Sequence, residues 1–122
     1  MKSNSKEKTS NDFLAGKSQI TLQLFDHFIA QFQKVGPLKV RATKSMIAID
    51  SPDKSIAYVT QLGKNFIHVV FPFKKAYPDN LCFQKIAQVL GDNNQFNHHF
   101  RMLAKEDVNA EVKKFMKLAY LK

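Results

Sequence analysis

The hydrophobic residues of this chain follow two spacings, an alternation with period two and a recurrence every three to four residues. Residues 64–73 hold the densest apolar run, and its aromatic and β-branched side chains favour a strand at the centre of a sheet. Because successive side chains of a strand point to opposite faces, we expect two sets. The sets are Ile67, Val69, Phe71 and Phe73, which should face the helices, and Phe66, His68 and Val70, which should face away. Pro72 has no backbone N–H, so regular pairing is expected to stop near it.

Three segments have the apolar spacing of helices. Residues 19–34 carry a phenylalanine-rich stripe between a capping Ser18 and a Gly36-Pro37 stop. Residues 107–121 carry a second stripe, with acidic side chains early and lysines late, which is the order that the helix dipole favours. A shorter helix is predicted over residues 81–90, with its apolar positions at Cys82, Ile86, Val89 and Leu90.

Four further segments alternate between apolar and polar residues and are bounded by turn residues. They are residues 39–43, 46–49, 56–62 and 95–103. In the last segment one face holds Phe96, His98, Phe100 and Met102, and the other holds Asn97, His99, Arg101 and Leu103. The predicted order is α-β-β-β-β-α-β-α. It indicates an α+β fold in which a single, mostly antiparallel sheet of about five strands has amphipathic helices packed on one face.

The start of the chain is polar and charged, so residues 1–17 are predicted to form a flexible tail and residues 18–122 a single α+β domain. The start also lacks an apolar signal region, and no stretch approaches the roughly 20 apolar residues that span a bilayer. Cys82 is the only cysteine, which excludes an intramolecular disulfide and fits a reducing compartment. The sequence therefore predicts a cytoplasmic protein without a membrane partner.

The strongest signal in the composition is charge. There are 19 lysines and arginines against 10 acidic residues, a formal net charge of +9. Only Arg41 and Arg101 are arginines, whose guanidinium suits bidentate recognition. This balance favours a general attraction for anionic partners, including nucleic acid, over the readout of bases.

Motifs for catalysis or metal binding are absent from the sequence. The four histidines have no spacing typical of zinc ligands, and neighbouring His98 and His99 point to opposite faces of their strand. Cys82 has no local signature of a nucleophile, no carboxylates are paired, and four glycines form no phosphate-binding loop. We therefore predict no catalytic residue, no metal and no cofactor.

A binding surface is the better-supported prediction. If the helices cover one face of the sheet, the other face carries rings, imidazoles and an arginine, edged by lysines. The candidate ligand-binding residues are Lys44, Tyr58, Lys64, His68, Lys74, Lys75, His99 and Arg101. Such a mixture suits an anionic or aromatic small molecule, or single-stranded nucleic acid stacked on rings. Closure of this face by residues 1–17 or by a second copy of the chain is the alternative.

Several short motifs occur in order along residues 18–121. They are Leu24-Phe25 in the first helix, Lys-Ser-x-Ile-x-Ile from Lys44 to Ile49, the strand Asn-His-His-Phe-Arg-Met-Leu at 97–103, and an acidic-capped last helix closing in Ala119-Tyr120. In these motifs the chain resembles the bacterial domain-of-unknown-function family numbered five-six-five-five, which also occurs at the C-terminus of longer proteins labelled predicted transport proteins. The resemblance implies a compact fold and supplies no activity and no site residues. The transport label does not fit a chain without a membrane segment.

These observations predict a small binding or accessory module that is not an enzyme and that takes an anionic ligand or nucleic acid. Two alternatives remain. One is an enzyme that uses Cys82 or a histidine on an anionic metabolite. The other is a homodimeric interaction module that uses the uncovered face of the sheet as its interface.

Overall fold

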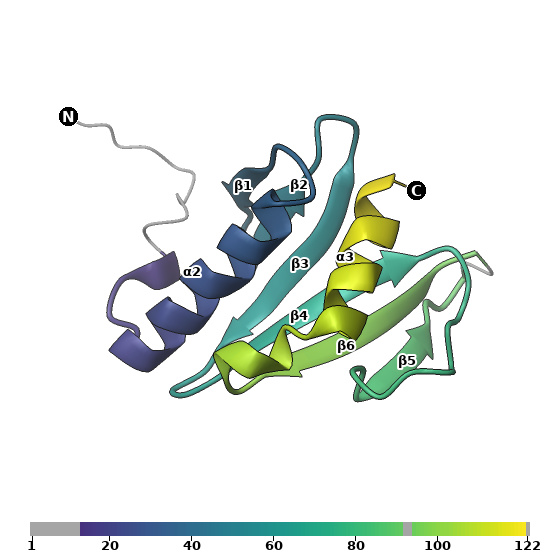
Figure 1. Cartoon of the computed structure of the whole chain (residues 1–122). Coiled ribbons are helices and arrows are strands. Elements are labelled where there is room, and N and C mark those ends of the chain that lie inside the picture. Colours follow the sequence, from purple (N-terminus) through teal and green to yellow (C-terminus); the bar gives the residue numbers. More distant parts are fainter. Residues whose placement is uncertain (1–12, 92–93, 122) are drawn as a thin grey trace.

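One antiparallel sheet with helices on one face makes up the protein. The computed structural model describes residues 13–91 and 94–121. Its six strands are β1 (Lys39–Ala42), β2 (Ile47–Asp50), β3 (Ser55–Leu62), β4 (Ile67–Phe73), β5 (Lys85–Gln88) and β6 (Phe96–Met102). They lie in the order β1-β2-β3-β4-β6-β5, and every neighbouring pair is antiparallel (Figure 1). The predicted α+β class and single sheet are confirmed, with one more strand than expected.

Two helices cover one face of the sheet (Figure 1). Helix α2 (Gln19–Gln33) begins where the Ser18 hydroxyl accepts a hydrogen bond from the Thr21 N–H at 3.1 Å, as predicted for a cap. Helix α3 (Ala110–Leu121) follows a short 3-10 turn η1 (Lys105–Asp107) and starts with the Asn109 side chain, which accepts from the Val112 N–H at 3.0 Å.

The core fills the layer between the sheet and these helices. From β4 it takes the predicted inward set, and Phe28 of α2 packs its ring 5.8 Å from Phe32, 6.4 Å from Phe71 and 6.2 Å from Phe100. Phe28, Phe32 and Phe71 are fully buried. Burial of such rings is the main term that stabilises a domain of this size.

The helix predicted over residues 81–90 is wrong. Residues 85–88 form β5, an edge strand paired with β6, while Leu81 and Leu90 are each 98% exposed. Phe83 turns its ring into the core, 4.8 Å from the ring of Phe115. A short apolar run has no period long enough to separate helix from strand, and the free edge of β6 decided the outcome by offering hydrogen-bond partners. The element order is therefore α-β-β-β-β-β-β-α.

The sheet splits at one end, between β3 and β4. Their pairing ends at Tyr58 and Val70, whereas β4 stays paired with β6 as far as Phe73. The first residues of β3 pair with β2 instead. Pro72 lies in the part of β4 that pairs with β6 but not with β3. The predicted stop in pairing therefore occurs on the β3 side only. Figure 1 shows β3 and β4 diverging from their common turn, and we call this opening the fork.

The predicted flexible tail falls mostly on residues 1–12, which lie outside the described residues. Phe13 and Leu14, at the start of the described part, are partly buried against the core. No helix in residues 13–91 or 94–121 combines the length and the apolar character needed to cross a membrane.

Candidate functional site

The face of the sheet opposite the helices, here called the open face, carries half of the eight predicted site residues. Strand register places Tyr58 opposite Val70, Val70 opposite His99, and His99 opposite Lys85. His68 lies opposite Arg101 in the adjacent row. Strands β3, β4 and β6 therefore bring Tyr58, His68, His99 and Arg101 onto one surface, as their alternation predicts.

Two imidazoles on the open face are in direct contact. Nε2 of His68 lies 2.9 Å from Nδ1 of His99, so one of these nitrogens donates a proton and the other accepts it. Nδ1 of His68 is buried and has no hydrogen-bond partner in the part of the chain that the structure describes. Burial lowers the pKa of both imidazoles, and the charge of nearby Lys85 lowers the pKa of each further. At neutral pH the pair is therefore uncharged.

Arg101 lies beside this pair. Its guanidinium carbon is 4.4 Å from the centroid of the Phe66 ring, within the range of a cation–π contact. Gly63 makes room for that ring, since a Cβ atom at Gly63 would lie 2.2 Å from it. Arg101 is exposed and forms no ion pair within residues 13–91 and 94–121. Its charge is available to a ligand.

A cavity of about 680 Å³ opens in the fork, and we call it the fork pocket. Its charged and aromatic lining side chains are Lys54, Tyr58, Phe73, Lys74, Lys75 and Tyr77. None of the described residues that line it is acidic. The ammonium of Lys75 lies 5.2 Å from the centroid of the Tyr77 ring, which holds one cation beside a flat aromatic surface. The fork pocket thus combines positive charge with rings.

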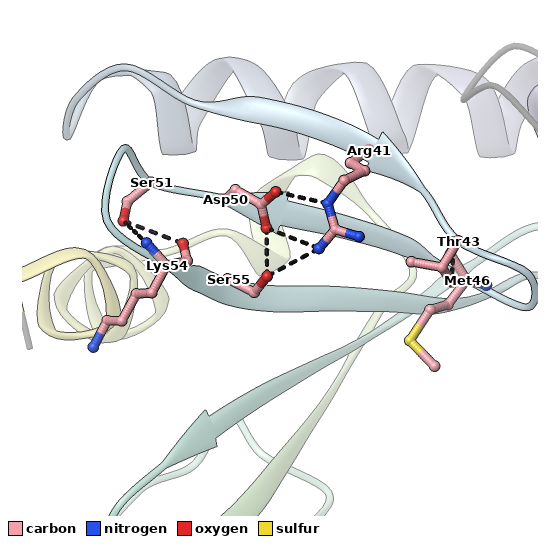
Figure 2. A network of polar contacts seen from close by, with 7 residues as sticks. All are labelled: Arg41, Thr43, Met46, Asp50, Ser51, Lys54 and Ser55. Carbon is pink, nitrogen blue, oxygen red and sulfur yellow. Dashed lines mark hydrogen bonds and ion pairs between the residues drawn. The ribbon is translucent and has the colours of Figure 1, made fainter.

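A second, smaller cavity of about 460 Å³ adjoins it and has balanced charges. Asp50 and Asp53 line it together with Lys39 and Lys54. Asp50 accepts hydrogen bonds from two other side chains of the protein, from Arg41 at 2.9 Å and from the Ser55 hydroxyl at 2.6 Å (Figure 2). Burial by itself raises the pKa of Asp50, but these hydrogen bonds outweigh burial and the pKa lies below its ordinary value. Because two acidic residues line this cavity and one of them, Asp50, is already paired with Arg41, it suits an anionic ligand less well.

His98 belongs to the core and not to the site. It is fully buried, its Nε2 accepts from the Tyr77 N–H at 3.1 Å, and its Nδ1–H donates to the Phe96 carbonyl at 2.9 Å. Both nitrogens are satisfied, which defines one neutral tautomer. The rings of Phe73 and Phe83 lie 4.9 Å and 5.1 Å from its own. Through its hydrogen bond with the Tyr77 N–H, His98 connects the loop after β4 to β6.

Cys82 is half-buried in the loop between β4 and β5, beside Glu111. Burial, the negative charge of Glu111 and a hydrogen bond to it raise the pKa of the thiol to about 12. The reactive species of cysteine is the thiolate, so Cys82 is a poor nucleophile at neutral pH.

The predicted lysines fall into two groups. Lys74 and Lys75 line the fork pocket with Tyr58. Lys44 and Lys64 are exposed in the β1–β2 and β3–β4 turns, toward the end of β3 that is opposite the fork. The structure therefore brings Lys74 and Lys75 to a cavity and leaves Lys44 and Lys64 away from it.

Sequence reasoning missed three residues of this region. Lys54 and Tyr77 line the fork pocket, and Lys85 lies opposite His99 on β5. Lys85 was hidden by the incorrect helix. A signal existed for the other two, since Lys54 lies two residues before a predicted strand and Tyr77 directly follows Lys74-Lys75-Ala76 after one. The start of β3 and the loop after β4 line one cavity only because the two strands separate at the fork.

Neither a search for metal-binding groups nor a comparison with known proteins adds a residue to the site. Within the described ranges, no group of three or more histidine, cysteine, aspartate or glutamate side chains is arranged to hold a metal ion. The resemblance to the family numbered five-six-five-five stays a prediction. No family model, no curated protein and no solved structure matches this chain.

Proposed function

We propose that this protein is a cytoplasmic, non-enzymatic binding module that holds an anionic ligand in the fork pocket. One observation carries the proposal. Lys54, Lys74 and Lys75 line the fork pocket, of about 680 Å³, and no described acidic residue lines it with them. Lysines gathered without counter-charges repel one another, and a bound anion relieves that repulsion.

The aromatic lining indicates the rest of the ligand. Tyr58 and Tyr77 offer flat apolar surfaces with a hydroxyl at one end, and Pro72 adds apolar area. A pocket with apolar walls and a few convergent polar groups is the usual form of a small-molecule site. We therefore propose a ligand that combines a phosphate or carboxylate group with a planar or apolar portion.

The test measures binding of adenosine triphosphate, pyrophosphate, citrate and a twelve-nucleotide oligothymidylate by calorimetry and thermal unfolding, at low and physiological salt. A ligand at 100 times its Kd is expected to raise the free energy of unfolding by about 2.7 kcal/mol. The variant Lys74→Ala/Lys75→Ala should lose at least tenfold in affinity, because one favourable charge contact is worth about 1.4 kcal/mol or more in such a pocket.

The matched control is Lys44→Ala/Lys64→Ala, which removes the same charge at the other end of β3. Affinity in this control should change less than about threefold, since exposed charges at that separation are screened by salt. Equal losses in both variants would mean that only the net charge of +9 attracts anions, and the fork pocket would not be the site.

Single-stranded nucleic acid is a second candidate, favoured by a specific contact on the open face. The Arg101 guanidinium stacked on Phe66 is an exposed cation and ring arrangement, the kind of platform on which bases stack. In this case affinity would rise with oligonucleotide length and fall steeply with salt. Arg101→Ala would then weaken the oligothymidylate more than it weakens adenosine triphosphate.

The enzyme alternative has less support. A thiol whose pKa is raised to about 12 supplies almost no thiolate at neutral pH. His98 has both nitrogens engaged by the backbone, so it is not available as a base. The remaining contact pair, His68 and His99, supports a different role.

A further inference from the structure

The contact between His68 and His99 limits the number of protons that the two imidazoles can carry. A neutral pair holds two protons on four ring nitrogens, and the 2.9 Å contact between Nε2 of His68 and Nδ1 of His99 uses one of them. In either arrangement one ring nitrogen keeps a free lone pair. A third proton can occupy that nitrogen without disturbing the contact, because a charged imidazolium still donates to its neutral neighbour. A fourth proton would place a hydrogen on both facing nitrogens and break the contact.

The charges around this pair are all positive. Arg101 from β6 lies opposite His68, and Lys85 from β5 lies opposite His99. On the neighbouring strand β3, Tyr58 lies opposite Val70. No described carboxylate forms an ion pair with Arg101 or Lys85. Burial disfavours an added proton on His68, and the charges of Arg101 and Lys85 disfavour it further, so the pair stays neutral.

We infer that His68, His99, Arg101 and Lys85 form a second anion site on the open face, and that this site takes up one proton when an oxyanion binds. Arg101 and Lys85 supply the fixed charge. The negative ligand offsets that charge and thereby favours the proton on the imidazole pair. The balance is simple: site, oxyanion and one proton from solvent form a complex in which the proton resides on an imidazole nitrogen. The proton moves from a solvent or buffer donor to the imidazole nitrogen, and no other covalent bond forms or breaks.

This second site is distinct from the fork pocket. His68 lies four residues before Pro72 along β4, which corresponds to about 13 Å of extended strand. Neither imidazole lines the fork pocket. The two sites can therefore fail or succeed independently, and the inference does not rest on the proposed function.

Sulfate is the probe for the test, since it stays a dianion throughout the pH range and cannot itself release or take up the proton. Histidine resonances of the full chain are followed by NMR from pH 8 to 5, with and without saturating sulfate at constant ionic strength. The pKa of the pair should rise by about one unit with sulfate. By linkage, affinity for sulfate should rise severalfold from pH 7.5 to 5.5, with about tenfold as the upper limit for a shift of one unit. The resonances of His98, on the other face, should not respond.

Proton uptake is measured directly by calorimetry in two buffers of different ionisation enthalpy. Uptake should be largest between the pKa of the free pair and that of the complex, at about half a proton per bound sulfate for a shift of about one unit, and should vanish in His68→Gln/His99→Gln. Arg101→Met and Lys85→Met each keep the aliphatic stem and should weaken sulfate at least threefold. The control Lys44→Met removes one charge elsewhere and should leave affinity within twofold.

Three results would overturn the inference. The pKa of the pair could be insensitive to sulfate, or sulfate could bind without proton uptake, or Lys44→Met could weaken binding as much as Arg101→Met. Lys74→Ala/Lys75→Ala separates the two sites. Proton-coupled binding of sulfate should persist in this variant even where binding in the fork pocket is lost.

Discussion

His98 and His99 are neighbours on β6, yet the two faces of the sheet give them opposite environments. His98 is fully buried, and both of its nitrogens are bonded to backbone groups. His99 is half-exposed, and the histidine it contacts has a buried nitrogen with no described partner. The hydrogen-bonding capacity of the imidazoles is thus fully used on one face of the sheet and only partly used on the other.

The difference teaches how to separate a structural histidine from a candidate site. A buried polar group is tolerated where its hydrogen bonds are satisfied, and His98 meets that condition. On the open face the imidazoles share one bond, and the nearby cations Arg101 and Lys85 have no described ion-pair partner. Unsatisfied polarity together with excess charge of one sign marks a surface as a candidate binding site.

The largest expected effect is the loss of His98. His98→Ala should lower the free energy of unfolding by about 3 kcal/mol. The change leaves a cavity among aromatic rings and removes the acceptor of the Tyr77 N–H. His99→Ala, the matched change on the open face, should cost less than about 1 kcal/mol. Urea unfolding of both variants makes the measurement. Equal losses would contradict the distinction between the two faces.

A smaller effect is expected from Gly63→Ala. The new Cβ would lie 2.2 Å from the Phe66 ring, so the ring must move away from beneath Arg101. We expect a loss of about 1–2 kcal/mol in the free energy of unfolding. Combining it with Phe66→Leu should recover part of this loss, because the smaller side chain removes the clash. A double-mutant cycle by urea unfolding tests the coupling, and additive losses would argue against it.

Acidification should destabilise the protein more gently. Burial lowers the pKa of His68, His98 and His99 in the folded state, so the unfolded chain binds more protons below about pH 6.5. The stabilisation that comes from keeping these histidines neutral is therefore complete above that pH. The free energy of unfolding falls as the pH drops toward the folded-state pKa values. His68→Gln/His99→Gln should make the dependence shallower. A urea midpoint that stays constant from pH 7.5 to 5.0 would show that these pKa values are not lowered.

The smallest perturbation is a label on Cys82. With its pKa raised to about 12, the native thiol should react with a disulfide reagent at pH 8 roughly a thousandfold more slowly than in the unfolded chain. Absorbance during labelling in native buffer and in urea gives the ratio. Faster labelling in His98→Ala than in His99→Ala would sharpen the comparison, because His98 ties down the loop that leads to Cys82. Similar rates in native and unfolded protein would refute the burial of this thiol.

Local periodicity was sufficient for much of the fold. The cap at Ser18, the apolar stripes of α2 and α3, and the two faces of β4 and β6 all follow from spacing, because each side chain's exposure repeats with its element's geometry. Periodicity failed at β5, where four residues are too few to show a period. That failure also hid Lys85.

The sequence by itself determined which residues share the open face, including Tyr58, His68, His99 and Arg101. Alternation along a strand is local and needs no knowledge of neighbours. Only the tertiary structure decided that His68 meets His99, that Lys54 and Tyr77 join Lys74 and Lys75, and that β3 leaves β4 beyond Tyr58. These features depend on strand register and on where pairing ends. Both are set by long-range packing, which leaves little trace in the order of residues along the chain.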